Sequence, residues 1–204
     1  MKSLIIIVLS SLSCYAQLPV ITKGFIEFEA ENYIAQTLNE KRNWEKITRK
    51  NTYHHAEKAG ENTYLKCLPD TRVTHEDKLI DGENFTNNSG KMAVLSYKIN
   101  FSKIGRYYVW VRAYSTGKED NGLHVGIDSQ WVESGKRMQW CEGKNAWTWG
   151  SKQRTDKNHC GEPYLIYLDI EEIGEHFIQF SMREDGFEFD KFILTTDKNF
   201  TPNQ

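Results

Sequence analysis

The stretch RMQWCEGKNAWTWGSKQR, residues 137 to 154, combines tryptophans with polar side chains and shows no helix or strand period. Four of the six tryptophans in the chain fall between positions 131 and 149. Sugar rings stack their C–H faces on aromatic rings, while amide, carboxylate and guanidinium groups bond their hydroxyls. The stretch therefore predicts a ring-stacking loop, with candidate contacts at Trp140, Trp147, Trp149, Asn145 and Arg154.

Burial beneath its own loop is the alternative for any one of these tryptophans. Burial of all four would require a small apolar core, which the Lys, Glu, Gln and Asn neighbours do not supply. We therefore expect exposed indole rings in this segment.

Other polar segments are expected to converge on the same rim. Asp120 and Asn121 precede the apolar run LHVGID, and a second polar group precedes the last alternating segment: Arg183, Glu184 and Asp185. The long charged segment of residues 68 to 90 adds Arg72 and His75. Solvated loop charge is the common alternative for such runs. Because arginine bonds planar anions through two nitrogens, selection of a carboxylated or sulfated ligand is predicted at Arg72, Arg137, Arg154 and Arg183.

Acid–base catalysis is a competing interpretation of these loops. Glycoside hydrolysis needs two carboxylates roughly 5 to 10 Å apart across the scissile bond. The acids that could supply such a pair are Glu119, Asp120, Glu142, Glu184 and Asp185. The chain has no Gly-x-Ser-x-Gly nucleophile motif and no His-Glu-x-x-His metal motif.

Three cysteines follow the N-terminal segment: Cys67, Cys141 and Cys160. An odd number in an oxidising compartment predicts one bridge and one free thiol. A bridge between Cys141 and Cys160 would close the tryptophan-rich loop, whereas Cys67 alternates in phase with Leu65 and is expected to be buried. A zinc site is disfavoured because the paired close spacings of zinc ligands are missing.

The N-terminal residues MKSLIIIVLSSLSCYAQ resemble a secretory signal peptide, with one lysine, an apolar run and small residues before Gln17. We expect residues 1–16 to be removed and residues 17–204 to form one domain, located outside the cell or in the periplasm. Cys14 would also suit a lipoprotein, although Ser11 is a poor residue three places before it.

The rest of the sequence contains no second apolar segment that could span a membrane. Its basic residues are scattered and its net charge is −2, which argues against binding to nucleic acid.

Short alternating segments dominate after residue 24. They are FIEFEAENY, YLKCL, AVLSYKINF, RYYVWVRAYS, LHVGID, YLIYLDI, HFIQFSMRE and FEFDKFILTT. Turn signals such as Asn121-Gly122 separate several of them, and a short helical turn is expected only near residues 39–46. The chain is therefore predicted to be all-β, a sandwich or jelly roll of about eight to ten antiparallel strands.

In this order the segments resemble a family 6-type carbohydrate-binding module, a galactose-binding-like jelly roll. The resemblance runs through Phe28-Glu29-Ala30-Glu31-Asn32-Tyr33, residues 105–114, Ile127-Asp128, Ala146-Trp147-Thr148-Trp149, residues 174–176 and residues 187–192. It spans residues 25 to 195. The charged segment of residues 68–90 and the loop between the cysteines are longer than this family's pattern.

The resemblance implies a structural calcium ion held by Glu29, Glu31 and Asp190, since the family's opening Glu-x-Glu and closing Asp bind one. Carboxylates spaced by two on a strand share a face, and calcium takes oxygen ligands. Solvent-facing acids on an edge strand are the alternative. The resemblance also places Trp147 at the family's stacking position.

The leading hypothesis is a secreted, non-catalytic protein that binds a plant or algal polysaccharide, with or without a separate glycan-degrading enzyme as partner. The first alternative is a small polysaccharide-cleaving enzyme, which release of reducing sugar would reveal. The second is a cell-surface adhesion module, which would use exposed aromatic residues to bind protein.

Overall fold

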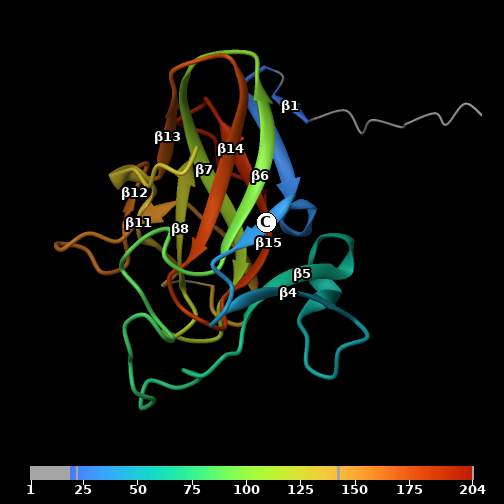
Figure 1. The fold of residues 1–204 in the computed structure, drawn as a ribbon, viewed down its shortest axis with the longest axis vertical. Coiled ribbons are helices and arrows are strands. Elements are labelled where there is room, and N and C mark those ends of the chain that lie inside the picture. The colour runs from blue at the N-terminus through green and yellow to red at the C-terminus, as the bar shows by residue number, and fades with distance from the viewer. Residues whose placement is uncertain (1–18, 22, 142, 204) are drawn as a thin grey trace, which may run out of the picture.

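The computed structural model describes residues 19–21, 23–141 and 143–203, and these form two facing β-sheets. The predicted signal peptide and Cys14 lie outside the described residues. Figure 1 shows β6, β14 and β8 running side by side along the long axis. No helix among the described residues is long and apolar enough to cross a membrane.

The first sheet has eight strands, and its main path is β1-β6-β14-β8-β9-β11-β12, with β3 also paired to β6. Their bounds are β1 Val20–Ile21, β3 Ala35–Thr37, β6 Val94–Phe101, β8 Gly122–Ile127, β9 Met138–Gln139, β11 Lys152–Gln153, β12 Glu162–Pro163 and β14 Gly174–Met182. All pairs are antiparallel except β1 with β6.

The second sheet has seven strands in the order β10-β7-β15-β5-β4, with β13 paired to β7 and β2 paired to β15. Their bounds are β2 Phe25–Glu29, β4 Asn43–Thr48, β5 Thr63–Leu68, β7 Gly105–Tyr114, β10 Trp147–Gly150, β13 Tyr167–Ile170 and β15 Glu188–Thr195. Four short 3₁₀ turns accompany the strands: Ala30–Asn32, Ala56–Lys58, Gly60–Asn62 and Glu133–Gly135. The all-β prediction is confirmed.

Aromatic rings from both sheets fill the core. Tyr97 of β6 packs edge-on against Phe192 of β15 at 4.9 Å between ring centroids, and Phe180 of β14 contacts the same ring at 4.9 Å. The Tyr97 hydroxyl donates to the Ala30 carbonyl at 2.6 Å, so this buried polar group is satisfied. The two sheets are therefore joined by direct ring contacts in the layer between them.

On β7, alternation sends Tyr107, Val109, Val111 and Ala113 into the core. Trp110 consequently points away from the core and is only half-buried, although the apolar character of both faces of β7 allowed either orientation. The helical turn expected near residues 39–46 is wrong, because residues 43–48 form β4, whose Trp44 is buried and donates to the Ala93 carbonyl at 2.7 Å.

The predicted disulfide is confirmed: Cys141 and Cys160 are joined, with their Cα atoms 5.4 Å apart. Cys67 is a buried free thiol within the described chain, and burial raises its pKa. The bridge ties the segment before β10 to the segment before β12.

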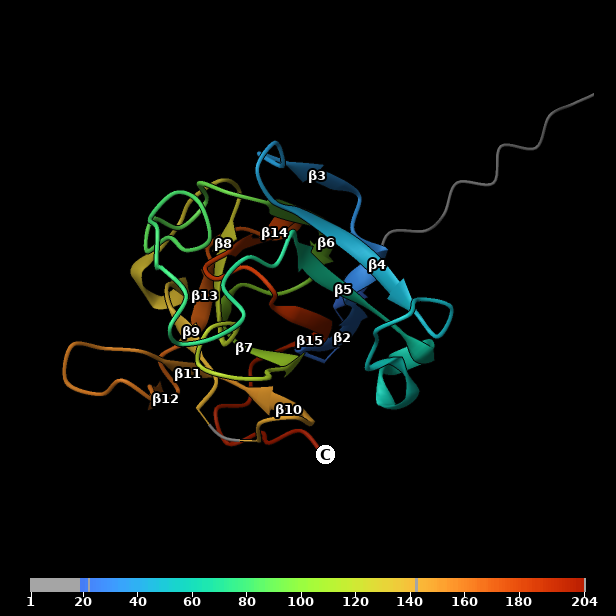
Figure 2. The ribbon, with the colours of Figure 1, turned by 90° about the horizontal axis from the view of Figure 1, so that it is seen from below.

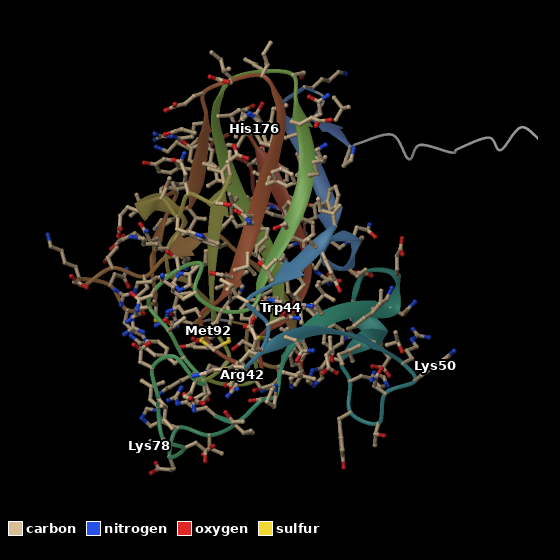
Figure 3. The ribbon with its side chains drawn as sticks, viewed as in Figure 1. Arg42, Trp44, Lys50, Lys78, Met92 and His176 are labelled. Atoms are coloured by element: carbon tan, nitrogen blue, oxygen red, sulfur yellow. A yellow bond between two sulfur atoms is a disulfide. The ribbon has the colours of Figure 1, made fainter. Side chains whose placement is uncertain are left out.

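Long loops gather at one end of the sheets. Figure 2 views this end and shows the loop of residues 69–93 in green beside β8, β9 and β11, while β4 and β5 lie on the opposite side. Figure 3 shows Met92 and Trp44 near this end, Lys78 at the outer edge of the long loop, and His176 at the far end of the molecule. The candidate site lies at this loop-bearing end.

Candidate functional site

A hollow of about 190 Å³ lies where five chain segments meet, and its lining is strongly cationic. The segments are the loop after β5, the loop between β7 and β8, the residue before β9, the stretch after β11 and the residues that follow β14. The lining residues are Arg72, His75, Leu79, Phe85, Asn87, Lys118, Arg137, Arg154, His159, Arg183 and Glu184. We call this hollow the arginine pocket. Glu184 is the one acidic residue in its described lining.

Arg183 is the most deeply buried member, with 1% of its surface exposed. Its Nη1 lies 2.5 Å from Glu184 Oε1, and its guanidinium carbon lies 5.0 Å from the centre of the Phe85 ring. Glu184 Oε2 also accepts a hydrogen bond from the Asn121 backbone at 3.0 Å. Burial is the largest effect on both partners: it lowers the pKa of Arg183 and raises the pKa of Glu184.

The remaining positive charge in the arginine pocket is poorly neutralised. Among the described residues, the buried Nε atoms of Arg72, Arg137 and Arg183 have no hydrogen-bond partner. The acid nearest Arg137 is the exposed Asp156, 3.6 Å away. Burial lowers the pKa of Arg154, and Arg183 and Arg137 lower it further. An anion entering the pocket would meet unpaired guanidinium donors.

His124 supports the floor of the arginine pocket in its neutral form. Its Nε2 donates to the Thr86 carbonyl at 3.1 Å, and its Nδ1 accepts from the Arg137 backbone at 3.0 Å. Burial, with Arg183 and Arg137 adding to it, lowers the pKa of His124 from 6.5 to about 3. The imidazole therefore joins the long loop to the start of β9 without adding charge.

Five predicted ligand residues lie together in the arginine pocket, as the sequence suggested: Arg72, His75, Arg154, Arg183 and Glu184. Arg137, expected to select an anion, also lines it. Lys118, His159 and Phe85 also line the pocket and were not predicted from the sequence. The position of His159 beside Cys160 was the one signal for it, because the bridge places residue 160 next to the tryptophan-rich segment.

Three other predicted ligand residues have structural contacts and lie outside the lining of the arginine pocket. Asp120 accepts from the Ser115 hydroxyl at 3.0 Å and from backbone groups of residues 116 and 117. Asp185 accepts from Arg42 Nε at 3.2 Å and from Thr71 Oγ1 at 2.7 Å. Asn121 Oδ1 accepts from Gln139 Nε2 at 2.5 Å. These carboxylate and amide groups hold loops in place.

The predicted exposed tryptophan loop is wrong in two respects. Residues 147–150 form an edge strand paired with β7, and Trp147 and Trp140 are only 7% and 4% exposed. Trp147 packs edge-on against Tyr64 at 5.1 Å and donates to the His55 carbonyl at 2.8 Å. The covering segment around His55 and Ala56 is distant in sequence, and it supplies the apolar cover that the local neighbours lack. Trp149 stays half-buried and donates to the Asn203 carbonyl at 3.0 Å.

Asn145 lines a hollow of about 440 Å³ that is separate from the arginine pocket, together with Trp147, His55 and Tyr114. The His55 ring stacks on Tyr114 at 3.8 Å, and its Nδ1 lies 2.8 Å from Glu188 Oε2. The structure therefore separates Asn145 from the arginines of the predicted rim.

The implied calcium ligands lie near one another where β2 and β15 pair. Asp190 Oδ2 lies 2.5 Å from Arg112 Nη1, and Glu29 Oε1 lies 2.9 Å from Lys191 Nζ. Glu29 Oε2 and both Glu31 oxygens are buried without a hydrogen-bond partner among the described residues. Burial raises the pKa of Glu29, Glu31 and Asp190. These oxygens suit calcium chemically. In the part of the chain that the structure describes, however, no three acids, histidines or cysteines are grouped as a metal site.

Of the five acids proposed for hydrolysis, Glu142 lies outside the described residues. Glu119 and Asp120 are buried, and Glu184 is the one of the described acids that lines the arginine pocket. Asp185 is fully buried and binds Arg42 and Thr71. The described lining of the arginine pocket therefore holds one carboxylate and not the two that glycoside hydrolysis needs.

No family model matches the chain. Uncharacterized protein P23 of Formosa agariphila is 54% identical over 187 residues, which are 88% of this chain and 45% of that protein. The chain thus spans less than half the length of this curated relative.

Among solved structures, the GH26-CBM35 β-(1,4)-mannanase of Podospora anserina is similar with a TM-score of 0.50 and 12% identity, over 90% of this chain and 29% of that chain. A family 35 carbohydrate-binding module of Clostridium thermocellum is similar over 83% of this chain and 96% of that one, with 12% identity and a TM-score of 0.45. At such identity the likeness to the mannanase shows the fold alone. The predicted jelly roll is confirmed at that level.

Trp147→Ala is expected to lower the free energy of unfolding by roughly 3 to 5 kcal/mol, since it removes a buried indole from a small cluster. Urea unfolding followed by circular dichroism measures this loss. Trp149→Ala, which removes a half-buried ring from the same strand, is the matched control and should cost much less. A wild-type unfolding midpoint for Trp147→Ala would contradict the buried position of the ring.

His124 should make the fold acid-sensitive. In the unfolded chain His124 binds a proton near pH 6.5, whereas in the folded chain it stays neutral down to about pH 3. The contribution of His124 is therefore complete above pH 6.5 and falls by up to about 1.4 kcal/mol per pH unit below it. Urea titrations between pH 7 and pH 4 should show wild type losing stability relative to His124→Gln, whereas the exposed-site variant His75→Gln should follow wild type. Parallel curves for wild type and His124→Gln would refute this.

Proposed function

We propose that the chain is a secreted, non-catalytic carbohydrate-binding protein whose ligand is an anionic polysaccharide of plant or algal origin. The observation that carries this proposal is the arginine pocket, where the buried Nε atoms of Arg72, Arg137 and Arg183 have no hydrogen-bond partner among the described residues. Buried polar donors are rarely left unpaired, so such a set indicates a place for an anion. The jelly-roll fold is compatible with sugar binding.

Arg154 is the member best placed to meet a ligand, because it is half-buried and bordered by Arg137 and Arg183. Arg72 and Arg154 come from different loops, so a carboxylate or sulfate between them would bond two separate segments. Arginine forks bond the planar oxygens of such groups through two nitrogens. Arg183 pairs with Glu184 and lies over Phe85. It forms the floor of the arginine pocket and adds positive charge there.

Among the described residues that line the arginine pocket, Glu184 is the one acid, and this favours binding over hydrolysis. Glu184 is held by Arg183 and by the Asn121 backbone, so neither oxygen is free to transfer a proton to a sugar. A separate glycan-degrading enzyme, or the part of a longer protein that this chain does not span, is the proposed source of any cleavage.

We also propose that calcium stabilises the fold through Glu29, Glu31 and Asp190. The support is chemical: three buried carboxylate oxygens lack hydrogen-bond partners in the described structure, and calcium takes oxygen ligands of this kind. Lys191 and Arg112 already face Glu29 and Asp190, which leaves Glu31 as the acid in greatest need of a cation.

Arg154→Ala should weaken binding to anionic polysaccharides about ten- to hundredfold, because a charged hydrogen bond contributes roughly 1.5 to 3 kcal/mol. Affinity electrophoresis in gels containing polygalacturonate, carrageenan or neutral laminarin measures the change. Arg106→Ala is the matched control, since Arg106 is half-exposed and pairs with Asp169 outside the arginine pocket. Equal retention of wild type and Arg154→Ala in every charged gel, or retention of wild type by laminarin alone, would overturn the proposal.

Millimolar calcium should raise the melting temperature by several degrees relative to EDTA, because a ligand that binds only the folded chain stabilises it. Differential scanning calorimetry makes the comparison. Glu31→Gln should abolish the calcium effect, whereas Glu83→Gln, at an exposed acid paired with Lys41, should retain it. Identical melting of wild type in calcium and in EDTA would exclude this site.

A further inference from the structure

A third cavity, of about 350 Å³, lies between β7, β10 and the segment that carries the Cys141–Cys160 bridge. Its walls are largely aromatic and apolar. They include Trp110, Trp140, Trp149, Gly150, Pro163 and Tyr164. We call this cavity the aromatic pocket.

The geometry of β7 and β10 determines which aromatic side chains line the aromatic pocket. Trp110 points outward from β7, and Trp149 lies alongside it on β10, opposite Arg112. The Trp149 indole nitrogen is held by the Asn203 carbonyl at 3.0 Å. Trp140 forms the floor, and Gly150 permits it to do so: a Cβ at Gly150 would lie 2.5 Å from the indole ring. Larger residues at position 150 would displace the floor.

Two buried polar atoms of the lining lack partners. Trp140 is 4% exposed and Gln139 is 3% exposed. The Trp140 Nε1 donor and the Gln139 Oε1 acceptor have no hydrogen-bond partner among the described residues, and both residues line the aromatic pocket. An indole N–H needs an acceptor and an amide oxygen needs a donor. A hydroxyl group supplies both, and aromatic walls suit the C–H face of a sugar ring.

The aromatic pocket adjoins the arginine pocket. On three segments the two linings are one or two residues apart: Gln139 and Arg137, Lys152 and Arg154, Cys160 and His159. Two residues of chain span at most about 7 Å, so the pockets are within reach of one short oligosaccharide.

We propose that the aromatic pocket binds an uncharged sugar residue next to the charged residue held in the arginine pocket. The recognised unit is then at least a disaccharide in which a carboxylated or sulfated residue adjoins an uncharged one. This inference rests on the proposed function for the charged half of the ligand. The uncharged half depends on Trp140, Trp149 and Gln139 alone.

The test is isothermal titration of the full chain with oligosaccharides of three kinds. In hyaluronan and κ-carrageenan fragments, charged and uncharged residues alternate; in polygalacturonate every residue is charged; in laminarin none is. Wild type should bind at least one alternating fragment more tightly than polygalacturonate. Trp149→Ala should weaken that binding ten- to hundredfold and change polygalacturonate binding by less than twofold. Trp140→Phe, which keeps a ring on the floor and removes the N–H, should weaken it three- to tenfold.

Arg154→Ala separates failure of this inference from failure of the proposed function. Suppose that Arg154→Ala no longer binds any charged ligand, while Trp149→Ala and Trp140→Phe bind as wild type does. The aromatic pocket would then hold only water. Loss of binding in the tryptophan variants with no effect of Arg154→Ala would overturn the anionic ligand and leave the aromatic pocket as a sugar site. Tighter binding of polygalacturonate than of every alternating fragment would refute the disaccharide. Melting curves of each variant exclude unfolding as the cause.

Discussion

Burial of the Arg183 guanidinium is the constraint that organises the loop-bearing end of this molecule. A cation with 1% exposure needs a counter-ion, and Glu184 provides it at 2.5 Å. Glu184 is in turn held by the Asn121 backbone, and the Arg183 carbonyl accepts from the Thr86 backbone at 2.8 Å. One ion pair thus fastens three segments that are far apart in sequence. Gly122 makes the approach possible, since a Cβ there would lie 2.6 Å from Arg183 Nη1.

The same arrangement leaves an excess of positive charge in one place. Burial lowers the pKa of Arg154, the neighbouring Arg183 and Arg137 lower it further, and the neutral His124 contributes no counter-charge. A chain selected for stability alone would place a second acid here or replace the arginines with apolar residues. Natural proteins break such rules mainly at functional sites, where the ligand supplies the missing partner. This excess of positive charge supports the proposal of an anionic ligand.

The sequence predicted the positions of the strands better than it predicted which side of each strand faces the core. Alternation located most of the long strands, and cysteine counting identified the bridge between Cys141 and Cys160. Alternation alone was insufficient where both faces are apolar, so the outward position of Trp110 depended on which side of β7 meets the opposite sheet. Arg72, Arg137, Arg154 and Arg183 were predicted to select an anion because arginine bonds planar anions through two nitrogens, and all four line the arginine pocket. The burial of Trp147 was not predictable, because its cover at Ala56 comes from a segment about ninety residues away.

The two tryptophans of β10 have different environments. Trp147 and Trp149 point to the same side of β10, yet Trp147 is buried against the turn at residues 56–58, whereas Trp149 is half-buried and lines the aromatic pocket. The difference arises beyond the strand: the disulfide fixes Cys160 beside Cys141, which leaves Pro163 and Tyr164 as the opposite wall of that cavity. A covalent constraint that limits loop motion before binding reduces the entropy that a ligand must overcome. Because the bridged segment also carries Arg154 and His159, the same constraint orders one wall of the arginine pocket and one wall of the aromatic pocket.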